Sequence, residues 1–464
     1  MTAKTLGLLT EADRIRSESD LNFSDEIIEA IYAEAEKIAN ESIVLDGDDS
    51  RDWSGFFDDI VTSPITGIPI MIIGLATIFY ITIWGANYPS QMIATGLFYI
   101  EGVMAGLFDS MGAPWWLTGF IWHGVYRGLA WVIAVMLPPM AIFFPMFTLL
   151  EDLGYLPRVA FNLDPLFRKV GAHGKQALTM SMGFGCNAAG IISTRIIDSP
   201  RERLIAIITN NFVPCNGRFP TLIMISIIFV AAEFPPGLTA VIASLSVVAI
   251  VMIGVIVTLG VSFVLSKTVL KGEASTFALE LPPYRRPKIL RVLYTSLIDR
   301  TMIVLWRAII WAAPAGAVIW LLGNISLDGS TLTSISANFL DPLGRVIGLD
   351  GVVMLTYIIA IPANEIVIPT MIMAYMNESA MLELGSLEEL RQLLVVDHGW
   401  TLITGINLML FSLLHSPCST TIYTIWKETG NVKWTALATF IPLFLAFLVT
   451  FVVYQLSVVF GFVG

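Results

Sequence analysis

The chain contains three cysteines, and each follows a glycine or a proline inside an apolar stretch. A helix broken inside a membrane frees backbone carbonyl groups, and these groups, together with thiols, carboxylates and imidazoles, suit a divalent transition-metal ion. A single buried cysteine is an ordinary packing residue, but three of three at helix breaks favour metal ligation. There is no Cys-x-x-Cys pair, and an odd count leaves no complete disulfide framework. The cysteines and their expected breakers are Cys186 with Gly183 and Gly185, Cys215 with Pro214, and Cys418 with Pro417.

Two further side chains are predicted ligands beside these cysteines. Glu365 lies in the apolar run 358–373, where an ionisable residue is costly and indicates function by default. Its other reading is a residue that faces water at a hairpin tip. His415 precedes Cys418 by three residues, and residues at this spacing lie on the same face of a helix. The alternative is that His415 is a packing residue held by hydrogen bonds.

A short segment occurs twice in the chain. Leu163-Asp164-Pro165-Leu166 returns as Leu340-Asp341-Pro342-Leu343, with an offset of 177 residues (341 − 164 = 177). Each copy leads into an apolar stretch that contains Gly or Pro, 175–196 in the first copy and 351–376 in the second. A duplicated, interrupted apolar segment indicates the binding site of a transporter.

The same offset pairs Asn187 with Asn364. We expect Asn187 to contribute to the metal site and Asn364 to belong to the gate, but each amide could either donate a carbonyl oxygen or cap a helix. Arg218 places a charge within another apolar stretch. It could be a gate partner, or its side chain could snorkel to the membrane surface.

The composition is that of a polytopic membrane protein. Of the 464 residues 56% are hydrophobic and 14% are charged, against about 25% charged in soluble proteins. The net charge of −11 and the acidic first 60 residues argue against nucleic-acid binding, and no signal peptide is expected. A full span needs about 20 apolar residues. Seven stretches qualify: 66–85, 122–150, 203–231, 238–266, 302–323, 400–426 and 434–461.

The segment 91–109 is expected to be a separate, weaker element in the membrane interface, because Glu101 and glycines interrupt it. The basic loop from Lys267 to Arg291 should be cytoplasmic by the positive-inside rule. Basic residues flank both ends of 175–196, which predicts a re-entrant hairpin from the cytoplasm. Acidic flanks predict that 351–376 is a hairpin that enters from the opposite face. The tally of seven spans and two hairpins then leaves the C-terminus outside.

The predicted fold class is an all-α polytopic membrane protein with an inverted repeat and two re-entrant or broken gate helices. Residues 1–60 are predicted to form an acidic cytoplasmic segment, with an amphipathic docking helix over 24–40. Residues 61–464 should form the transmembrane permease domain, with 122–231 as repeat one and 302–426 as repeat two.

The motifs around the breaks resemble the membrane domain of FeoB-type ferrous iron transporters over about residues 60–464. The resemblance implies paired gate regions, with Cys186 as a ferrous-iron ligand, although Asn364 stands where that family often has Lys. Family members typically begin with a GTP-binding domain, whereas Gly171 to Gln176 only approaches a P-loop and lacks its Ser or Thr. The matching motifs are Leu150 to Arg158, Gly183 to Asn187, Phe212 to Pro220, Asn364 to Val367 and Lys427 to Trp434.

We therefore expect a multi-pass protein of the cell membrane that moves Fe(II) into the cytoplasm and is not itself an enzyme. Its expected partners are the lipid bilayer and a separate cytoplasmic GTPase subunit; a homo-oligomer is left open, and no GTP site or nucleic-acid partner is expected. One alternative is a gate-type transporter of an organic solute such as a nucleoside. Another is a membrane scaffold without transport, which polar residues inside apolar segments disfavour.

Overall fold

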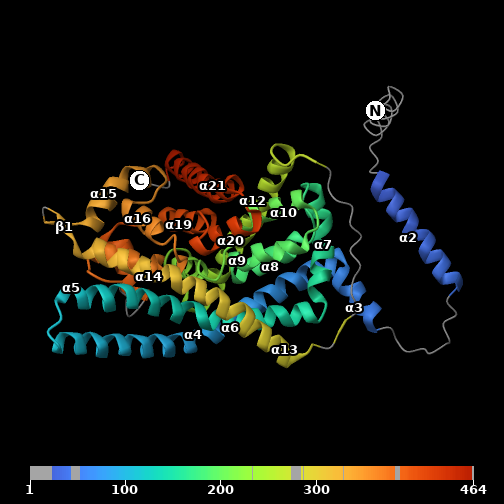
Figure 1. Ribbon diagram of the computed structural model, residues 1–464. Coiled ribbons are helices and arrows are strands. Elements are labelled where there is room, and N and C mark those ends of the chain that lie inside the picture. Colours follow the sequence, from blue (N-terminus) through green and yellow to red (C-terminus); the bar gives the residue numbers. More distant parts are fainter. Residues whose placement is uncertain are drawn as a thin grey trace, which may run out of the picture.

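Helices make up almost the whole described chain, as the predicted fold class requires (Figure 1). In the described residues the exception is one antiparallel pair of short strands, β1 (Ser326–Leu327) and β2 (Ser330–Thr331). The computed structural model describes residues 23–42, 53–232, 234–272, 284–285, 287–327, 329–381 and 387–461.

The predicted amphipathic helix near the N-terminus is present as α2 (Phe23–Ser42), and its Ile27 and Ile31 side chains are exposed. The next helix, α3 (Trp53–Thr62), is attached to the body by Asp58, whose carboxylate lies 2.9 Å from the Arg158 guanidinium. Hydrogen bonding by Arg158 lowers the pKa of Asp58. The acidic residues within 43–52 lie outside the described residues.

Six helices of the described chain are long and apolar enough to cross a membrane, or seven if one bent pair is a single span. Their outward side chains, such as Leu245 and Phe444, are apolar and exposed, as lipid-facing residues are. The long elements are α4 (Pro64–Ser110), α5 (Trp115–Thr118) with η1 (Gly119–Tyr126) and α6 (Arg127–Asp152), α12 (Pro236–Lys267), α13 (Ile289–Tyr294) with η5 (Thr295–Met302) and α14 (Ile303–Asn324), α19 (Leu402–Leu414) with α20 (Ser419–Thr429), and α21 (Val432–Val459).

The prediction of a separate interfacial segment at 91–109 is wrong. These residues continue the same 47-residue helix, α4, that contains the span 66–85. Glu101 does not interrupt it, because its carboxylate is buried against two partners on the next helices: Arg127 Nη2 at 2.8 Å and His123 Nδ1 at 2.6 Å. A charge that is paired in this way can remain within an apolar helix.

The prediction of one continuous span over 203–231 is also wrong. Pro214 lacks the backbone donor that a helix needs, and the chain is irregular from Val213 until Arg218. A span of the right length is therefore divided into two helical parts. Its elements are α10 (Pro200–Thr209), η3 (Asn210–Phe212), α11 (Phe219–Ile225) and η4 (Ser226–Val230).

The two stretches that follow the repeated segment are both broken helices, as predicted. Their breaks have the same backbone geometry: Cys186 has φ −156° and ψ 124°, and Ala363, its counterpart at the offset of 177, has φ −153° and ψ 116°. The first stretch forms α8 (Gln176–Gly185), α9 (Asn187–Ser193) and η2 (Thr194–Ile196), and the second forms α16 (Gly351–Ile359), η6 (Asn364–Ile366) and α17 (Val367–Met376).

Identical contacts precede both stretches. The Asp164 carboxylate accepts a hydrogen bond from Gly174 N–H at 3.0 Å, and the Asp341 carboxylate accepts one from Gly351 N–H at 3.1 Å. The sequence repeat is therefore also a repeat of local structure. These contacts connect α7 (Tyr155–Lys169) to the start of α8, and α15 (Leu332–Val346) to the start of α16.

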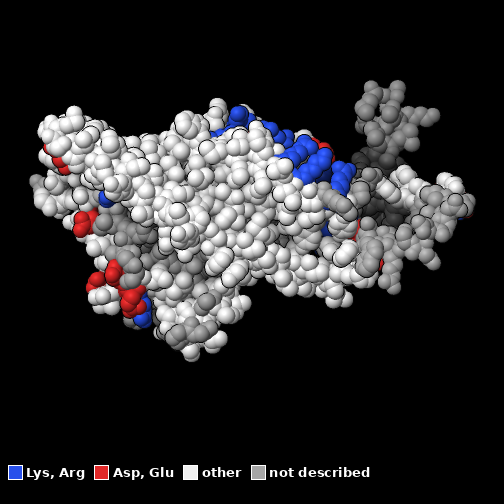
Figure 2. All heavy atoms as spheres, turned by 90° about the horizontal axis from the view of Figure 1, so that it is seen from below, with Lys and Arg blue, Asp and Glu red and all other residues white. Residues whose placement is uncertain are grey.

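The two copies begin at opposite ends of the body, with α7 at one end and α15 at the other (Figure 1). Ser266, near the end of α12, donates a hydrogen bond to Val170 O before α8, and Asn324, at the end of α14, donates one to Ser379 O after α17. We call the end that contains α7 the basic end and the end that contains α15 the acidic end. On the face seen in Figure 2, Lys and Arg gather toward the first and Asp and Glu toward the second. Inversion of the repeats across a membrane, and the domain division, stay predictions.

Helices α18 (Leu387–Arg391) and η7 (Gln392–Asp397) connect the second broken stretch to α19. Local signals set the starts of the helices around the breaks. The Thr401 side chain accepts a hydrogen bond from Thr404 N–H in a capping box at the start of α19. Ser199 caps α10, and Pro200 occupies its first position, where a missing N–H costs nothing.

Candidate functional site

Four helix breaks meet in two pairs. Asn216 N–H, after Cys215, donates a hydrogen bond to Gly185 O at 3.4 Å, which brings the break in 203–231 to the break at Cys186. Ser419 N–H, after Cys418, donates one to Ile361 O at 2.8 Å in the second half. The repeat therefore duplicates the contact between breaks as well as the breaks themselves.

The predicted cysteines converge from three of these breaks. Cys186 lies near both Cys215 and Cys418, and the last two also lie near Glu365. All three cysteines are free of disulfide bonds, and each residue is partly buried. Within the part of the chain that the structure describes, no three His, Cys, Asp or Glu side chains are close enough to hold one metal ion together.

Glu365 lies against the loop that follows Cys215. A Cβ atom on Gly217 would collide with the Glu365 carboxylate, so a larger residue at this position would require the Glu365 side chain to move. The Glu365 backbone carbonyl accepts a hydrogen bond from Trp131 Nε1 of α6 at 3.3 Å. The carboxylate is thus placed between the two halves of the molecule.

His415 is buried, and both of its ring nitrogens have partners. Nδ1 lies 2.8 Å from the carbonyl oxygen of Ser412, so this nitrogen must carry the proton. Nε2 lies 3.2 Å from the side-chain amide of Asn364. The structure brings His415 and Asn364, both predicted site residues, together. In this arrangement both ring nitrogens of His415 face hydrogen-bond partners and neither faces an open metal position.

Arg218 does not snorkel, because its side chain is only 1% exposed. Its guanidinium donates hydrogen bonds to carbonyl oxygens of both halves, including those of Asn211 at 2.9 Å and Leu413 at 2.8 Å. It also donates to the oxygens of His415 and Ser416, at 3.1 Å and 3.2 Å. The carbonyl groups that the breaks release are therefore occupied in part by Arg218.

Neither repeated asparagine caps a helix by its side chain. Cys186 and Ala363 occupy the capping positions, and the asparagines come one residue later. Asn187 instead joins a chain of buried amides: its side-chain amide lies 3.2 Å from Asn211 Oδ1 on one side and 3.2 Å from Gly183 O on the other. Asn211 Nδ2 donates to His415 O at 2.9 Å, so the chain reaches Asn364 through His415.

The predicted gate glycines serve close packing. A Cβ on Gly185 would lie 2.5 Å from the Phe143 ring of α6, and one on Gly183 would lie 3.1 Å from Asn210 Oδ1. Neither has a positive φ. Pro214 and Pro417 each lie in an irregular stretch between two helices, as predicted.

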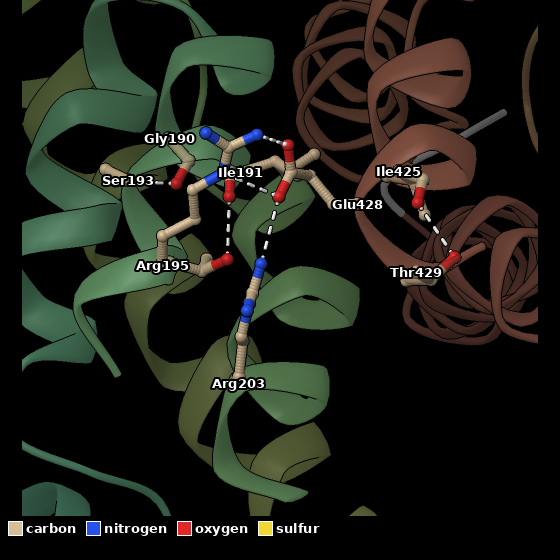
Figure 3. A network of polar contacts seen from close by, with 9 residues as sticks. Gly190, Ile191, Ser193, Arg195, Arg203, Ile425, Glu428 and Thr429 are labelled. Carbon is tan, nitrogen blue, oxygen red and sulfur yellow. Dashed lines mark hydrogen bonds and ion pairs between the residues drawn. The ribbon is translucent and has the colours of Figure 1, made fainter. Parts of the chain in front are cut away.

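Sequence reasoning missed a charge cluster at the basic end. Glu428, at the end of α20, is only 4% exposed and receives Arg195 Nη2 at 2.5 Å and Arg203 Nη2 at 2.9 Å. Both arginines point to it from the first half of the chain (Figure 3). We call these three residues the Glu428 cluster. The signal that could have found it is an acidic residue closing an apolar stretch.

The sequence reading also passed over Asn210 and Asn211, which directly precede the break at Pro214. Two neighbouring amides inside an apolar span are costly, and this cost was the available signal. Both side chains are only 1% exposed.

Comparison with known proteins gives matches that follow these elements. The Gate family model, described as "Nucleoside recognition", matches residues 133–229 and 305–432, and the model described as "Ferrous iron transport protein B C terminus" matches 247–299. No solved structure matches the chain significantly.

Relatives of known name align with most of the chain. The Fe(2+) transporter FeoB of Staphylococcus aureus (strain MSSA476) is 30% identical over 435 residues, which cover 91% of this chain and 62% of the relative. The FeoB of Synechocystis is 26% identical, covering 88% and 63%. A Porphyromonas gingivalis protein named as a fusion of Fe(2+) transport protein A and FeoB is 27% identical, covering 87% and 51%. The chain thus spans less than two thirds of the length of these relatives, and within that span it is a multi-pass membrane protein that belongs to the FeoB family.

Proposed function

We propose that the chain carries ferrous iron across the cell membrane, and that Cys186, Cys215 and Cys418 are ligands along the ion's path. The convergence of three free thiols from three helix breaks is the observation that carries this proposal. Fe(II) is a borderline ion that accepts sulfur ligands, and the relatives are named Fe(2+) transporters.

The ion would be passed between thiols and would not rest in a closed site. Transport requires binding that is strong enough to replace water and weak enough to release the ion. Among the described residues, no three Asp, Glu, Cys or His side chains are close enough to hold one ion together. This spread of the ligands fits the requirement for release. Glu365 would add negative charge beside Cys215 and Cys418, while Asn187 and His415 would hold the surrounding backbone in place.

The Glu428 cluster would close the basic end. It connects α20 to η2 and α10, so an opening movement between the two halves at this end must separate Glu428 from its arginines. The positive-inside rule makes this the cytoplasmic end. Iron would then leave toward the cytoplasm when the cluster parts.

Energy for transport would come from outside the residues that match. We propose that GTP hydrolysis, where it is used, takes place outside these 464 residues, and a separate subunit is the source we favour. The exposed apolar face of α2, with Ile27 and Ile31, is our proposed docking place for that subunit.

Uptake of Fe(II) into liposomes that contain the purified chain tests the proposal. An Fe(II)-quenched dye inside the vesicles would report uptake by the wild type and a marked loss for Cys186→Ser. Ala189→Ser, a substitution of similar size on α9, serves as the matched control. Wild-type vesicles that take up no more iron than empty ones would overturn the proposal.

A second candidate is transport of an organic solute such as a nucleoside. The description of the Gate model and the amide-rich chain from Asn187 to Asn364 favour it. The two candidates differ in competition: Mn(II) and Zn(II) should inhibit an iron path, whereas nucleosides should inhibit the alternative, in which Cys186→Ser has no effect.

A further inference from the structure

Glu101 is a buried carboxylate in the apolar helix α4, and the proposed function makes no use of it. Its side chain is 2% exposed, and Arg127, the first residue of α6, meets it as a fork. Arg127 Nη2 lies 2.8 Å from one carboxylate oxygen, and Arg127 Nε donates to the other at 3.2 Å. His123 Nδ1 lies 2.6 Å from the first of these oxygens. Charge inside an apolar helix of a membrane protein is costly, so this arrangement indicates a function.

The fork also directs the remaining terminal nitrogen of Arg127. A guanidinium group is planar and rigid, so two bonds to one carboxylate fix where its third nitrogen points. Arg127 Nη1 donates to the backbone carbonyl of Met381 at 3.3 Å, although the two residues are 254 positions apart in sequence. Met381 is 4% exposed. Glu101 therefore positions a donor from the first half of the chain against a carbonyl group of the second half.

Trp131 makes a second contact of this kind from the same helix. Residues four positions apart share a helical face, so Trp131 lies on the face of α6 that carries Arg127. Trp131 Nε1 donates to Glu365 O at 3.3 Å. Glu365 lies just before α17, and Met381 lies shortly after it. Helix α6 thus holds both ends of α17, which is the second part of a broken gate stretch.

The fork on Glu101 has the same form as the one in the Glu428 cluster. Arg195 meets Glu428 through Nε and Nη2, as Arg127 meets Glu101. In both places the arginine belongs to the first half of the chain and contacts the second half, through the carboxylate in one case and through Nη1 in the other. The segment after α17 lies beside the end of α14, at the acidic end, and α5, which follows α4, lies toward the same end (Figure 1). The two forks therefore serve opposite ends of the body.

We propose that Glu101 is a positioning residue for transport. It orients Arg127 so that Arg127 holds the segment after α17 in place, and the ion path opens at the acidic end when this contact parts. We call Glu101, Arg127 and Met381 the acidic-end latch. The proposal rests on the proposed function, in which the Glu428 cluster closes the basic end and the two ends open in turn. His123 remains beside Glu101 when Arg127 moves, so the buried carboxylate keeps a partner in the open state.

Labelling of the native cysteines from either side of the membrane tests the latch without iron. Right-side-out and inside-out vesicles present opposite ends of the full chain to a maleimide that does not cross the bilayer. Glu101→Gln removes the charged fork, so labelling should become about tenfold faster from the acidic end and stay unchanged from the basic end. Unchanged labelling from the acidic end would overturn the proposal. Equally faster labelling from both sides would also overturn it, because it would show a generally loosened fold.

Two further variants separate positioning from direct action. If Glu101 acts through Arg127, then Arg127→Gln and the double variant should both label at the rate of Glu101→Gln, because all three remove one contact. Effects that multiply in the double variant would contradict the positioning role. Glu388→Gln is the matched control: its side chain is 81% exposed and pairs with Arg391 within α18 at 3.8 Å, so its labelling should match the wild type.

The outcome can be separated from that of the transport experiment. Because the labelling needs no iron, a chain that takes up no iron can still show the sided response, and the latch then stands while the proposed substrate falls. A chain that takes up iron but shows no sided response keeps its proposed function and loses only the latch.

Discussion

Arg195 forms a two-point ion pair with Glu428, although the two residues are 233 positions apart in sequence. Its Nε and Nη2 lie 2.9 Å and 2.5 Å from the two carboxylate oxygens, and Arg203 shares one of those oxygens at 2.9 Å. Such a fork fixes direction as well as distance. The relationship connects the first broken stretch to the last one at the basic end.

Glu428→Gln should loosen this connection. The amide cannot offer two charged oxygens to two guanidinium groups, so we expect faster hydrogen exchange in residues 194–196 and a lower unfolding midpoint. Because both arginines are partly exposed, water screens the pair and the expected loss is about 1 kcal/mol, well short of that for a fully buried pair.

The control for this variant is Asp198→Asn. Asp198 pairs with Lys175 at 3.1 Å, but its side chain is 80% exposed, so its loss should change neither observable. Equal effects of the two substitutions would contradict a special role for Glu428.

Serine substitution at the three cysteines should alter ion preference as well as rate. Oxygen is a harder ligand than sulfur and favours Mn(II) over Fe(II). Cys186→Ser, Cys215→Ser and Cys418→Ser should therefore each reduce Fe(II) uptake by about tenfold while reducing Mn(II) uptake less, a ratio measured in the same liposomes. A uniform fall for both metals would indicate only a damaged fold.

The repeated aspartate contacts should contribute equally to stability. Asp164 and Asp341 accept equivalent backbone hydrogen bonds, so Asp164→Ala and Asp341→Ala should each cost about 1–2 kcal/mol. Chemical denaturation in detergent measures both. Strongly unequal losses of unfolding free energy would show that the two equivalent contacts do not contribute equally to stability.

His173 should make stability depend on pH. Burial lowers its pKa from the ordinary 6.5, and the neutral ring accepts a hydrogen bond at Nδ1 from Lys175 N–H at 3.0 Å. The unfolded chain therefore takes up a proton at higher pH than the folded chain does. This contribution is complete above about pH 6.5 and is lost as the pH falls below it.

Unfolding midpoints between about pH 5 and 8 measure this dependence. His173→Asn, which keeps a side-chain acceptor, should flatten the curve, whereas His398→Asn at an exposed position should not. A wild-type curve with no slope below pH 6.5 would contradict the assignment.

Features of the fold and the site that depend on neighbouring residues could be predicted from the sequence, whereas features that depend on residues far apart in the chain could not. The breaks at Cys186, Cys215 and Cys418 follow from local backbone chemistry, since glycine and proline act on their own turn. The contact between Asn216 and Gly185 and the ion pairs of Glu428 join residues far apart, so the partners in these contacts cannot be identified from the local sequence. Glu101 was misread for the same reason, because the partners that neutralise it lie on other helices.

Arg218 should prove the most sensitive residue of the polar core. Its guanidinium bonds carbonyl groups on both sides of the molecule, and a lysine ammonium cannot reach them all from one point. Arg218→Lys should therefore cost more than about 2 kcal/mol, because at least one buried carbonyl loses its partner. Arg307→Lys on α14 provides a control of the same chemistry. The measurement is the unfolding midpoint, together with maleimide labelling of Cys215 and Cys418, which should become faster when the segments held by Arg218 separate. A variant with unchanged labelling and stability would show that the helix breaks are held by the surrounding packing and not by Arg218.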